Sequence, residues 1–324
     1  MRIIVTGGAG FIGSHVVDAY VNAGHEVLVI DNLSSGSLGN VNSEAKFEEI
    51  DIRDAHGVAK VFASFRPQIL NHHAAQIDIR RSVADPVFDA EVNVIGSVNL
   101  MQQAVQSHVE GFIFASSGGA IYGETPHPAV ETAAKAPISP YGAAKAAVEN
   151  YLFAYRKTFG LRSVILRYAN VYGPRQDPAG EAGVVSIFTS ALIAGWGVTI
   201  FGSGEQVRDY VFVKDVAQAN LLALDHVQSD VHDTNNPDEM AFNIASGRAT
   251  SVNALYDEIV KIIPTNIDAV HAQGRPGELM ESKLEITRVG DVLGFFPQVK
   301  LPDGLLQTIA WQKNVKGAQV KRVH

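Results

Sequence analysis

The chain has 324 residues, of which 46% are hydrophobic and 19% are charged, a balance typical of a globular protein with a sizeable core. Its net charge of −8 argues against nucleic acid or an anionic membrane as the main partner, and the absence of cysteine excludes disulfides and thiolate metal sites. No apolar run approaches the ~20 residues of a membrane span, and no signal peptide precedes the first strand-like run. We therefore expect a cytoplasmic protein.

The first predicted unit joins two strands through a glycine-rich turn and a helix. The strand Ile3-Ile4-Val5 runs into Gly7-Gly8-Ala9-Gly10-Phe11-Ile12-Gly13, a spacing that lets the backbone approach a pyrophosphate at the helix N-terminus. Asp31 lies 18 residues past Gly13, where an acid hydrogen-bonds an adenosine ribose. No lysine or arginine lies between Asn32 and Val41 to meet a 2′-phosphate, which favours NAD over NADP. The alternative is an ordinary tight turn with a solvated aspartate.

The alternation of strands and helices continues through the first half of the chain. Hydrophobic patterns predict strands over 26–30, 46–50, 68–72, 111–115 and 163–168, and helices over 14–22, 55–65, 88–107 and 141–159. Such alternation predicts an α/β fold with a doubly wound parallel sheet, whose ligands bind at the carboxyl ends of the strands. Residues at these ends are Asp31, Asp51, Ala74, Ser116, Ser117 and Asn170.

The pattern becomes less regular after Asn170. Residues 171–178 read as a loop, and later segments predict helices over 184–194, 216–226 and 252–263 and strands over 199–204, 207–213 and 242–245. We expect residues 1–173, with a return segment at about 211–250, to form an NAD-binding Rossmann domain. Residues 174–210 and 251–324 are expected to form a smaller C-terminal lobe that binds the substrate.

The pair Tyr141 and Lys145 is the main catalytic candidate. Residues four apart on a helix share one face, about one turn from each other. A lysine ammonium beside a phenol favours the phenolate and lowers the tyrosine pKa from its ordinary value of about 10. The pair can then serve as a general base, although the same spacing also occurs by chance on solvated helices.

Further motifs follow one another along the chain. They are Thr6–Gly13, Asp31–Leu33, His73–Gln76, Asn93–Gly96, Tyr141 with Lys145, Arg167–Arg175, Arg208–Val211, Phe242–Ile244 and Arg275–Glu278. In this order they resemble the extended short-chain dehydrogenase/reductases, and within them the nucleotide-sugar 4-epimerases of the UDP-glucose 4-epimerase type. The resemblance covers nearly the whole chain, which makes it far more specific than any single motif.

The resemblance implies an isomerase that uses NAD without net redox change. Tyr141 as phenolate takes the proton from a sugar 4-hydroxyl, the C4 hydride passes to NAD⁺, and it returns to the other face of the 4-keto sugar. Lys145 lowers the tyrosine pKa and bonds the nicotinamide ribose. The implied NAD contacts are Gly7, Gly10, Phe11, Ile12, Gly13, Asp31, Asn32, Asp51, Ile52, Ala74, Ala75, Gln76, Asn93, Ser116, Tyr141, Lys145 and Tyr168.

The chain departs from the family at the hydroxyl that usually completes this site. That hydroxyl lies four residues before a Tyr-Gly pair, and here the position is Gly118. We expect Ser117 to reach in from one residue earlier, which the flexible Gly118-Gly119 pair permits, with Ser116 as second candidate. The alternative is that the hydroxyl is missing and both serines satisfy backbone groups at a strand end.

Ala120 separates the reactions of this superfamily. Related dehydratases and decarboxylases carry a glutamate at that position as a further acid or base, and Ala120 therefore argues against both reactions. Epimerisation needs one acid/base and a hydride acceptor. A non-catalytic NAD-binding sensor on the same fold is another alternative, but such proteins typically lose the Tyr141–Lys145 pair.

The substrate side is implied by the same resemblance. Arg208 and Arg275 approach the nucleotide diphosphate, which arginine can bond bidentately, although a surface ion pair is the alternative for each. Ser282 takes a position that is bulky in relatives restricted to glucose and galactose, so its small size predicts room for N-acetylated sugars. The implied substrate contacts are Ser117, Gly118, Tyr141, Asn170, Val184, Val185, Phe201, Arg208, Arg275, Glu278 and Ser282.

The helices over 88–107 and 141–159 are apolar on more than one face, which predicts that something covers them. The resemblance implies a homodimer built from these two helices, and the alternative is that the C-terminal lobe covers them. The histidines are scattered, and His72-His73 has no carboxylate partner at ligand spacing, so we expect no metal.

Overall fold

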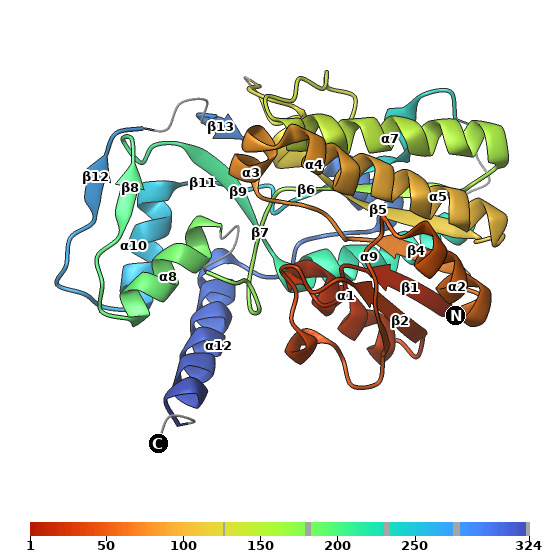
Figure 1. Ribbon diagram of the computed structural model, residues 1–324. Coiled ribbons are helices and arrows are strands. Elements are labelled where there is room, and N and C mark those ends of the chain that lie inside the picture. Colours follow the sequence, from red (N-terminus) through yellow and green to blue (C-terminus); the bar gives the residue numbers. More distant parts are fainter. Residues whose placement is uncertain (126, 179–182, 230–233, 275–278, 322–324) are drawn as a thin grey trace.

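The computed structural model describes residues 1–125, 127–178, 183–229, 234–274 and 279–321 of the chain. Its main sheet has seven strands, each parallel to its neighbours, in the order β10-β6-β5-β4-β1-β2-β3 (Figure 1). This order confirms the predicted doubly wound α/β fold, in which strand order reverses beside β1. The strands are β1 (Arg2–Thr6), β2 (Glu26–Asp31), β3 (Lys46–Glu49), β4 (Ile69–His72), β5 (Gly111–Ser117), β6 (Ser163–Tyr168) and β10 (Ala241–Ile244).

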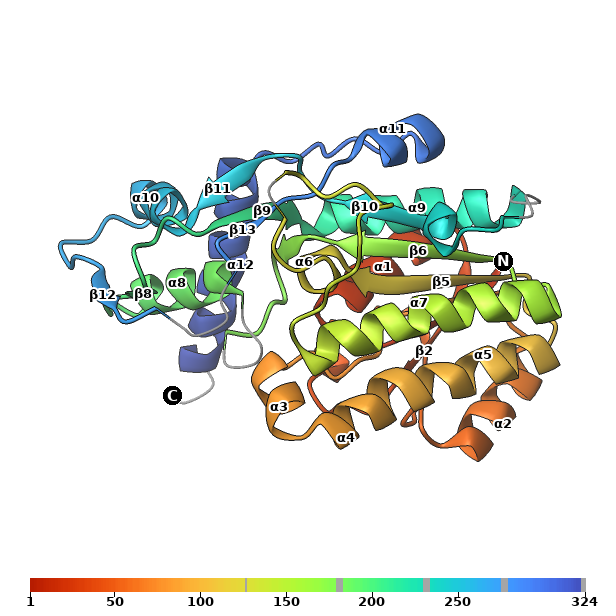
Figure 2. The same ribbon diagram turned by 90° about the horizontal axis from the view of Figure 1, so that it is seen from above.

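Helices cover both faces of this sheet (Figure 2). Ile3 and Val5 of β1 pack on one side with Val216, whereas Ile4 packs on the other side with Phe62. Both sides are apolar because a central parallel strand is buried on both faces. The covering helices are α1 (Phe11–Asn22) and α9 (Val213–Ser229) on the first side, and α2 (Ala55–Phe65), α5 (Gly96–Gln106) and α7 (Pro140–Phe159) on the second.

The helix predicted over 88–107 is interrupted by a π-helical turn. α4 (Pro86–Ala90) passes into η2 (Glu91–Ile95), which has π-type hydrogen bonding, before α5 begins. Such turns are often found at functional sites. Here the turn carries Asn93, whose side-chain amide binds both the N–H and the carbonyl of Gln76 at 2.9 Å.

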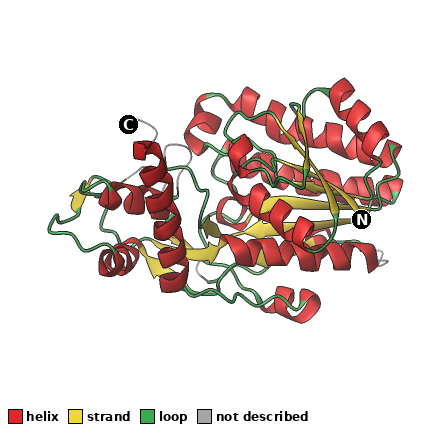
Figure 3. Ribbon diagram, turned by 90° about the horizontal axis from the view of Figure 1, so that it is seen from below, coloured by secondary structure: helices red, strands yellow, loops and turns green. Residues whose placement is uncertain are grey.

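The remaining segments form a smaller lobe beside the carboxyl edge of the main sheet (Figures 1 and 3). Its central strand, β9 (Val207–Phe212), pairs with β7 (Asn170–Tyr172), which lies where the sequence predicts a loop. Phe188, Leu255 and Leu305 are buried in the core of this lobe. The other elements are β11 (Ala249–Ser251) and β13 (Glu281–Ser282) beside β9, the pair β8 (Thr199–Phe201) and β12 (Val270–Ala272), and helices α8 (Val184–Ile193), α10 (Val252–Ile262) and α12 (Leu301–Lys321).

Three further short helices connect elements of the main fold. They are α3 (Ile79–Ala84), α6 (Gly118–Ile121) and the 3-10 turn η3 (Pro237–Met240). A fourth helix, α11 (Thr287–Leu293), lies within the range expected for the C-terminal lobe but packs on the main sheet, against β10 and α9. Within the described ranges of the chain, no helix is both long enough and apolar enough to cross a membrane.

Candidate active site

The glycine turn after β1 packs its backbone directly onto neighbouring strand ends. Gly7 has a φ of +70° and donates its N–H to the Ile30 carbonyl at 2.8 Å. A Cβ atom would lie 2.6 Å from the Ala74 nitrogen if built on Gly7, and 2.2 Å from the Gly7 carbonyl if built on Gly13. Neither distance is sterically possible, so both positions require glycine. The turn opens α1, whose first N–H groups form a positive end suited to a pyrophosphate.

Asp31 ends β2 beside this turn and is buried. Its carboxylate accepts the N–H of Ala9 at 3.0 Å and the N–H of Leu33 at 2.8 Å, so it also fixes the shape of the turn. Burial raises the pKa of Asp31, and the two backbone hydrogen bonds oppose that rise. The carboxylate therefore occupies the strand end where an adenosine ribose is bound in this kind of fold.

The next strand end brings a second acid close to the first. Asn32 donates to Asp51 at 3.0 Å, and Arg53 forms an ion pair with Asp51 at 2.8 Å. The hydrogen bond from Arg53 lowers the pKa of Asp51 to about 2. Ile52 is buried beneath these groups. The four residues expected at the adenosine end, 31–32 and 51–52, thus lie side by side.

The end of β4 supplies an unpaired donor or acceptor beside the glycine turn. His73 stacks on the Tyr168 ring, and its Nε2 lies 3.0 Å from the Tyr168 hydroxyl. Burial lowers the pKa of His73 to about 3, so the ring is neutral. Its Nδ1 is buried and finds no hydrogen-bond partner in the part of the chain that the structure describes. A buried polar atom of this kind fits a site in which a bound dinucleotide provides the missing partner.

The pair predicted to be catalytic lies at the same edge. α7 begins at Pro140, and the Ser139 side chain accepts the N–H of Gly142 at 3.1 Å. Lys145 is buried one turn further along, and its ammonium donates to the Ala115 carbonyl at 2.8 Å. The ammonium lies 5.8 Å from the centre of the Tyr141 ring. Burial lowers the pKa of Lys145 to about 8.

The short helix α3 supports the tyrosine from outside. Its Ser82 is fully buried and accepts the backbone N–H of Tyr141 at 2.7 Å. Hydrophobic pattern does not predict this helix, because six residues are too few to carry an apolar stripe. Its one local signal is Asp78, which caps the first turn by accepting the N–H of Arg81.

The two candidate serines differ in their surroundings. Ser116 is buried and donates to a carboxylate oxygen of Glu149 at 2.6 Å. Ser117 precedes α6, is only partly buried, and makes no capping hydrogen bond with its side chain. At Gly118 a Cβ atom would lie 2.5 Å from Cδ1 of Leu284. The leucine side chain therefore fills the space that the expected hydroxyl would need, and Ser117 is the less buried of the two serines.

Three substrate-side candidates share one face of the small sheet. Ser282 of β13 is the register partner of Arg208 on β9, and Asn170 of β7 is the partner of Tyr210. Arg208 and Tyr210 are two apart on their strand, so all four side chains lie on the same face. A Cβ on Gly119 would lie 3.8 Å from Oδ1 of Asn170 and 3.9 Å from Oγ of Ser282, which places the turn after β5 against this face.

The other substrate-side candidates are less closely grouped. Val185 is buried in the core of the C-terminal lobe, whereas Val184 and Phe201 are partly buried at its margin. Arg275 and Glu278 lie outside the described residues. Within the described ranges, no group of three or more His, Cys, Asp or Glu side chains is placed to hold a metal ion.

Together these features define an α/β dinucleotide-binding protein with a tyrosine–lysine pair at the carboxyl edge of its sheet. The model of the NAD dependent epimerase/dehydratase family matches residues 3–245, and the chain belongs to this family. The predicted family and the predicted cofactor, NAD, are thereby confirmed. The glycine turn, the strand ends at 31–32 and 51–52 and the orphaned nitrogen of His73 are the groups that would hold it.

Solved structures resemble the chain over nearly its full length. The UDP-glucose 4-epimerase of Thermotoga maritima, solved with UDP-glucose, is 45% identical with a TM-score of 0.92, covering 98% of this chain and 100% of its own. The UDP-glucose 4-epimerase of Thermus thermophilus, solved with NAD, is 42% identical with a TM-score of 0.89, covering 97% and 99%. A UDP-N-acetylglucosamine 4-epimerase of Methanobrevibacter ruminantium is 35% identical with a TM-score of 0.88, covering 97% and 98%.

A Lys145→Met variant tests the burial of the ammonium. The pKa of Lys145 is about 8 in the folded protein, whereas a lysine in an unfolded chain has a pKa of about 10.4. Between these values the unfolded state binds a proton that the folded state lacks. The free energy of unfolding therefore rises with pH there, by up to about 1.4 kcal/mol per unit. We expect denaturant titrations from about pH 7 to about pH 10 to show this rise in the wild type and its loss in K145M. Equal slopes in the two proteins would contradict the assignment.

Proposed function

We propose that the protein is a UDP-sugar 4-epimerase, an isomerase that interconverts UDP-glucose and UDP-galactose. The carrying observation is that Lys145, one turn after Tyr141, bonds the end of β5 at Ala115, and that the turn after β5 lies against Asn170 and Ser282, the register partner of Arg208. In this proposal the cofactor, the base and a phosphate-binding side chain would meet at the carboxyl edge of the sheet. Relatives that are UDP-glucose 4-epimerases at 45% and 42% identity support the same reaction.

The proposed chemistry needs one base and a reversible hydride acceptor. Tyr141 as phenolate removes the proton of the sugar 4-hydroxyl, while the Lys145 ammonium stabilises the phenolate by its charge. Ser117 hydrogen-bonds the same hydroxyl and holds it toward Tyr141. When bound, NAD supplies the acceptor for the C4 hydride. The 4-keto sugar then turns within the pocket so that the other face of C4 is presented to the cofactor and receives the hydride back, while Tyr141 returns the proton to the 4-oxygen.

The substrate would lie across the face that carries Asn170, Arg208 and Ser282. Arg208 meets the diphosphate, Asn170 meets the phosphate or the sugar, and Ser282 lies beside the sugar. Arg275 and Glu278 belong to this proposal by resemblance, as contacts to the diphosphate and the uridine ribose. In domain terms, the NAD-binding part is proposed to span 1–173 with the return segment, and the C-terminal lobe supplies the sugar site.

Ala120 weighs against the dehydratase and decarboxylase alternatives. It stands where those reactions need a carboxyl group that moves a second proton, and a methyl group cannot do so. The cytoplasm is the proposed location, since it is where nucleotide sugars and NAD are available together.

The proposed assembly is a homodimer through α4, α5 and α7. These helices lie next to one another on the outer side of the sheet. Together with the intervening turn η2, they expose large apolar side chains: Val87 is 68% exposed, Ile95 of η2 60%, Tyr151 44% and Phe159 53%. A second copy that covers this surface removes it from water, which gives the association its driving force.

The decisive experiment incubates the purified protein with UDP-glucose and no added reductant. We expect UDP-galactose to form without carbon dioxide or a dehydrated sugar. A Tyr141→Phe variant is expected to lose about a thousandfold in kcat, because it removes the only base in the proposed reaction. Tyr151→Phe, an exposed tyrosine on the same helix, is the matched control and should keep wild-type turnover. Undiminished turnover in Y141F would rule out the base assignment.

A Ser117→Ala variant tests whether the Ser117 hydroxyl substitutes for the hydroxyl that the family usually carries at the position of Gly118. Removing one oriented donor from a reacting oxygen typically costs about a hundredfold in kcat, and we expect a loss of that size. Steady-state kinetics with UDP-galactose measure it. If S117A turns over as fast as the wild type, the reaction needs no serine hydroxyl at this place.

Ser282 is proposed to leave room for an N-acetyl group on the sugar. Gly119, which has no side chain, lies opposite Ser282 and Asn170 and leaves the space between them open. A Ser282→Tyr variant should lose about a hundredfold in kcat/KM for UDP-N-acetylglucosamine, because the ring fills that space. The UDP-glucose pair is the internal control and should change much less. No turnover of the acetylated pair by the wild type would sink the idea.

A further inference from the structure

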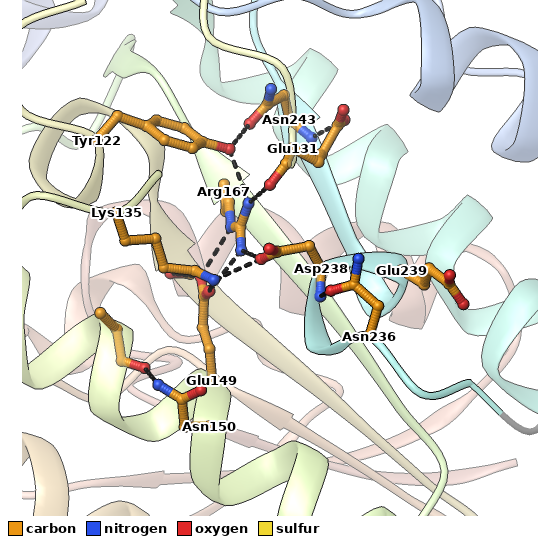
Figure 4. A network of polar contacts seen from close by, with 12 residues as sticks. Tyr122, Glu131, Lys135, Glu149, Asn150, Arg167, Asn236, Asp238, Glu239 and Asn243 are labelled. Carbon is orange, nitrogen blue, oxygen red and sulfur yellow. Dashed lines mark hydrogen bonds and ion pairs between the residues drawn. The ribbon is translucent and has the colours of Figure 1, made fainter. Parts of the chain in front are cut away.

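Arg167 of β6 is fully buried at the centre of a polar network (Figure 4). Its guanidinium donates to both carboxylate oxygens of Glu149, at 3.0 and 2.6 Å, and to Asp238 at 2.6 Å. It also donates to the Tyr122 hydroxyl at 2.8 Å and to the Glu131 carbonyl at 2.6 Å. Because every part of the cation is bonded, the network holds the supplying elements in one arrangement.

A buried ion pair of this kind is a weak source of stability, since the cost of removing the charges from water offsets much of their attraction. The network contains a second cation, Lys135, which lies 3.8 Å from Glu149 and forms an ion pair with Asp238. Its members come from α7, β6, η3 and the segment before α7. Its contribution is therefore better sought in the position it gives to α7 against the sheet.

Glu149 lies on the same face of α7 as the catalytic pair, since positions 141, 145 and 149 are four apart. Ser116 donates to Glu149 at 2.6 Å, and Lys145 donates to the Ala115 carbonyl at 2.8 Å. Two consecutive residues at the end of β5 are thus tied to two consecutive turns of the helix. Ser117 comes next in the chain, so these bonds set its position relative to the tyrosine.

Charge near the lysine comes from several elements. The titratable groups that face its ammonium are Tyr141 and Glu149 on α7, Asp89 on α4, and His72 and His73 at β4. Burial lowers the pKa of both histidines, so they are neutral, whereas Asp89 and Glu149 raise the pKa of Lys145 against the effect of burial. Glu149 therefore supplies negative charge that keeps the lysine protonated.

We propose that Glu149 is a positioning residue for the Tyr141–Lys145 pair, holding α7 against the end of β5 and supplying negative charge to the lysine. The proposal rests on the proposed function, because the pair is the base of that reaction. The proposal also assigns different roles to Ser116 and Ser117. Ser116 belongs to the support, bonded to Glu149, which leaves Ser117 to meet the substrate.

The test compares Glu149→Gln, which keeps the shape but removes the charge, with Glu149→Asp, which keeps the charge but shortens the reach. Without that charge Lys145 gives up its proton more readily. We expect the basic limb of the kcat/KM profile of E149Q to move to lower pH by about one unit, a tenfold loss of proton affinity. E149D should keep the limb and lose about tenfold in kcat at unchanged KM, because the pair is displaced.

The charge effect is also measurable without catalysis. The pH at which the free energy of unfolding begins to rise reports the Lys145 pKa, and it should fall in E149Q by the same amount. A glutamine side chain does not titrate, so the substitution adds no titrating group of its own. Lys135→Met is the control of opposite sign: it removes a positive charge beside the same carboxylate, so both readouts should move to higher pH.

The outcomes separate the two proposals. If the wild-type protein shows no epimerase activity, the proposed function is wrong. The unfolding curves of wild type and E149Q still test the link between Glu149 and Lys145 in that case. If neither the basic limb of the kcat/KM profile nor the pH dependence of unfolding moves in E149Q, the Glu149 charge does not act on Lys145. If E149Q does not fold, K135M and Ser116→Ala decide instead. S116A keeps the charge and removes one bond, so we expect kcat to fall a few fold with the limb in place. Wild-type kcat in both S116A and E149D overturns the positioning role.

Discussion

The arrangement at the carboxyl edge of the main sheet depends on the hydrogen bond from the buried Lys145 ammonium to the Ala115 carbonyl. An ammonium taken out of water needs strong partners, and the end of a strand supplies one here. The bond fixes how far along β5 the helix α7 lies, and so where its first turn presents Tyr141. Ser82 then holds that first turn from the outer side. Tyr141, the Lys145 ammonium and the end of β5 are therefore parts of one packed unit.

The proposed substrate face is joined to this unit by paired strands. β7 follows β6 after a single residue, and it pairs in parallel with β9, which runs directly into α9 of the main fold. Two hydrogen-bonded strands thus connect the main sheet with the C-terminal lobe. Because Asn170 and Arg208 lie on these two strands, they are presented at a fixed place relative to the carboxyl edge.

Local pattern was sufficient wherever an element has its own period or glycine signal. The helix over 55–65 has the predicted bounds, since Asp54 caps it and its apolar stripe is complete. The sequence predicts a loop where β7 forms, because three residues carry no alternation that differs from chance. The interruption at Glu91–Ile95 was missed because an apolar stripe continues through it.

Side-chain partners were harder to predict than elements. The sequence raises both serines at the end of β5, but the contact that distinguishes them, Ser116 with Glu149, joins residues on different elements. The sequence does not predict the stacking of His73 on Tyr168 for the same reason, since Tyr168 lies on another strand. Such contacts follow from the packing of whole elements, which no local window of sequence contains.

The contact between Gly118 and Leu284 constrains how the chain can change over evolutionary time. A side chain at position 118 and the end of the Leu284 side chain compete for one volume, so a larger residue at 118 requires the leucine to shift or to be replaced by a smaller residue. Adding a hydroxyl at 118 therefore disturbs a side chain on the segment that also carries Ser282. Through Leu284, a change at the end of β5 is coupled to the proposed sugar site.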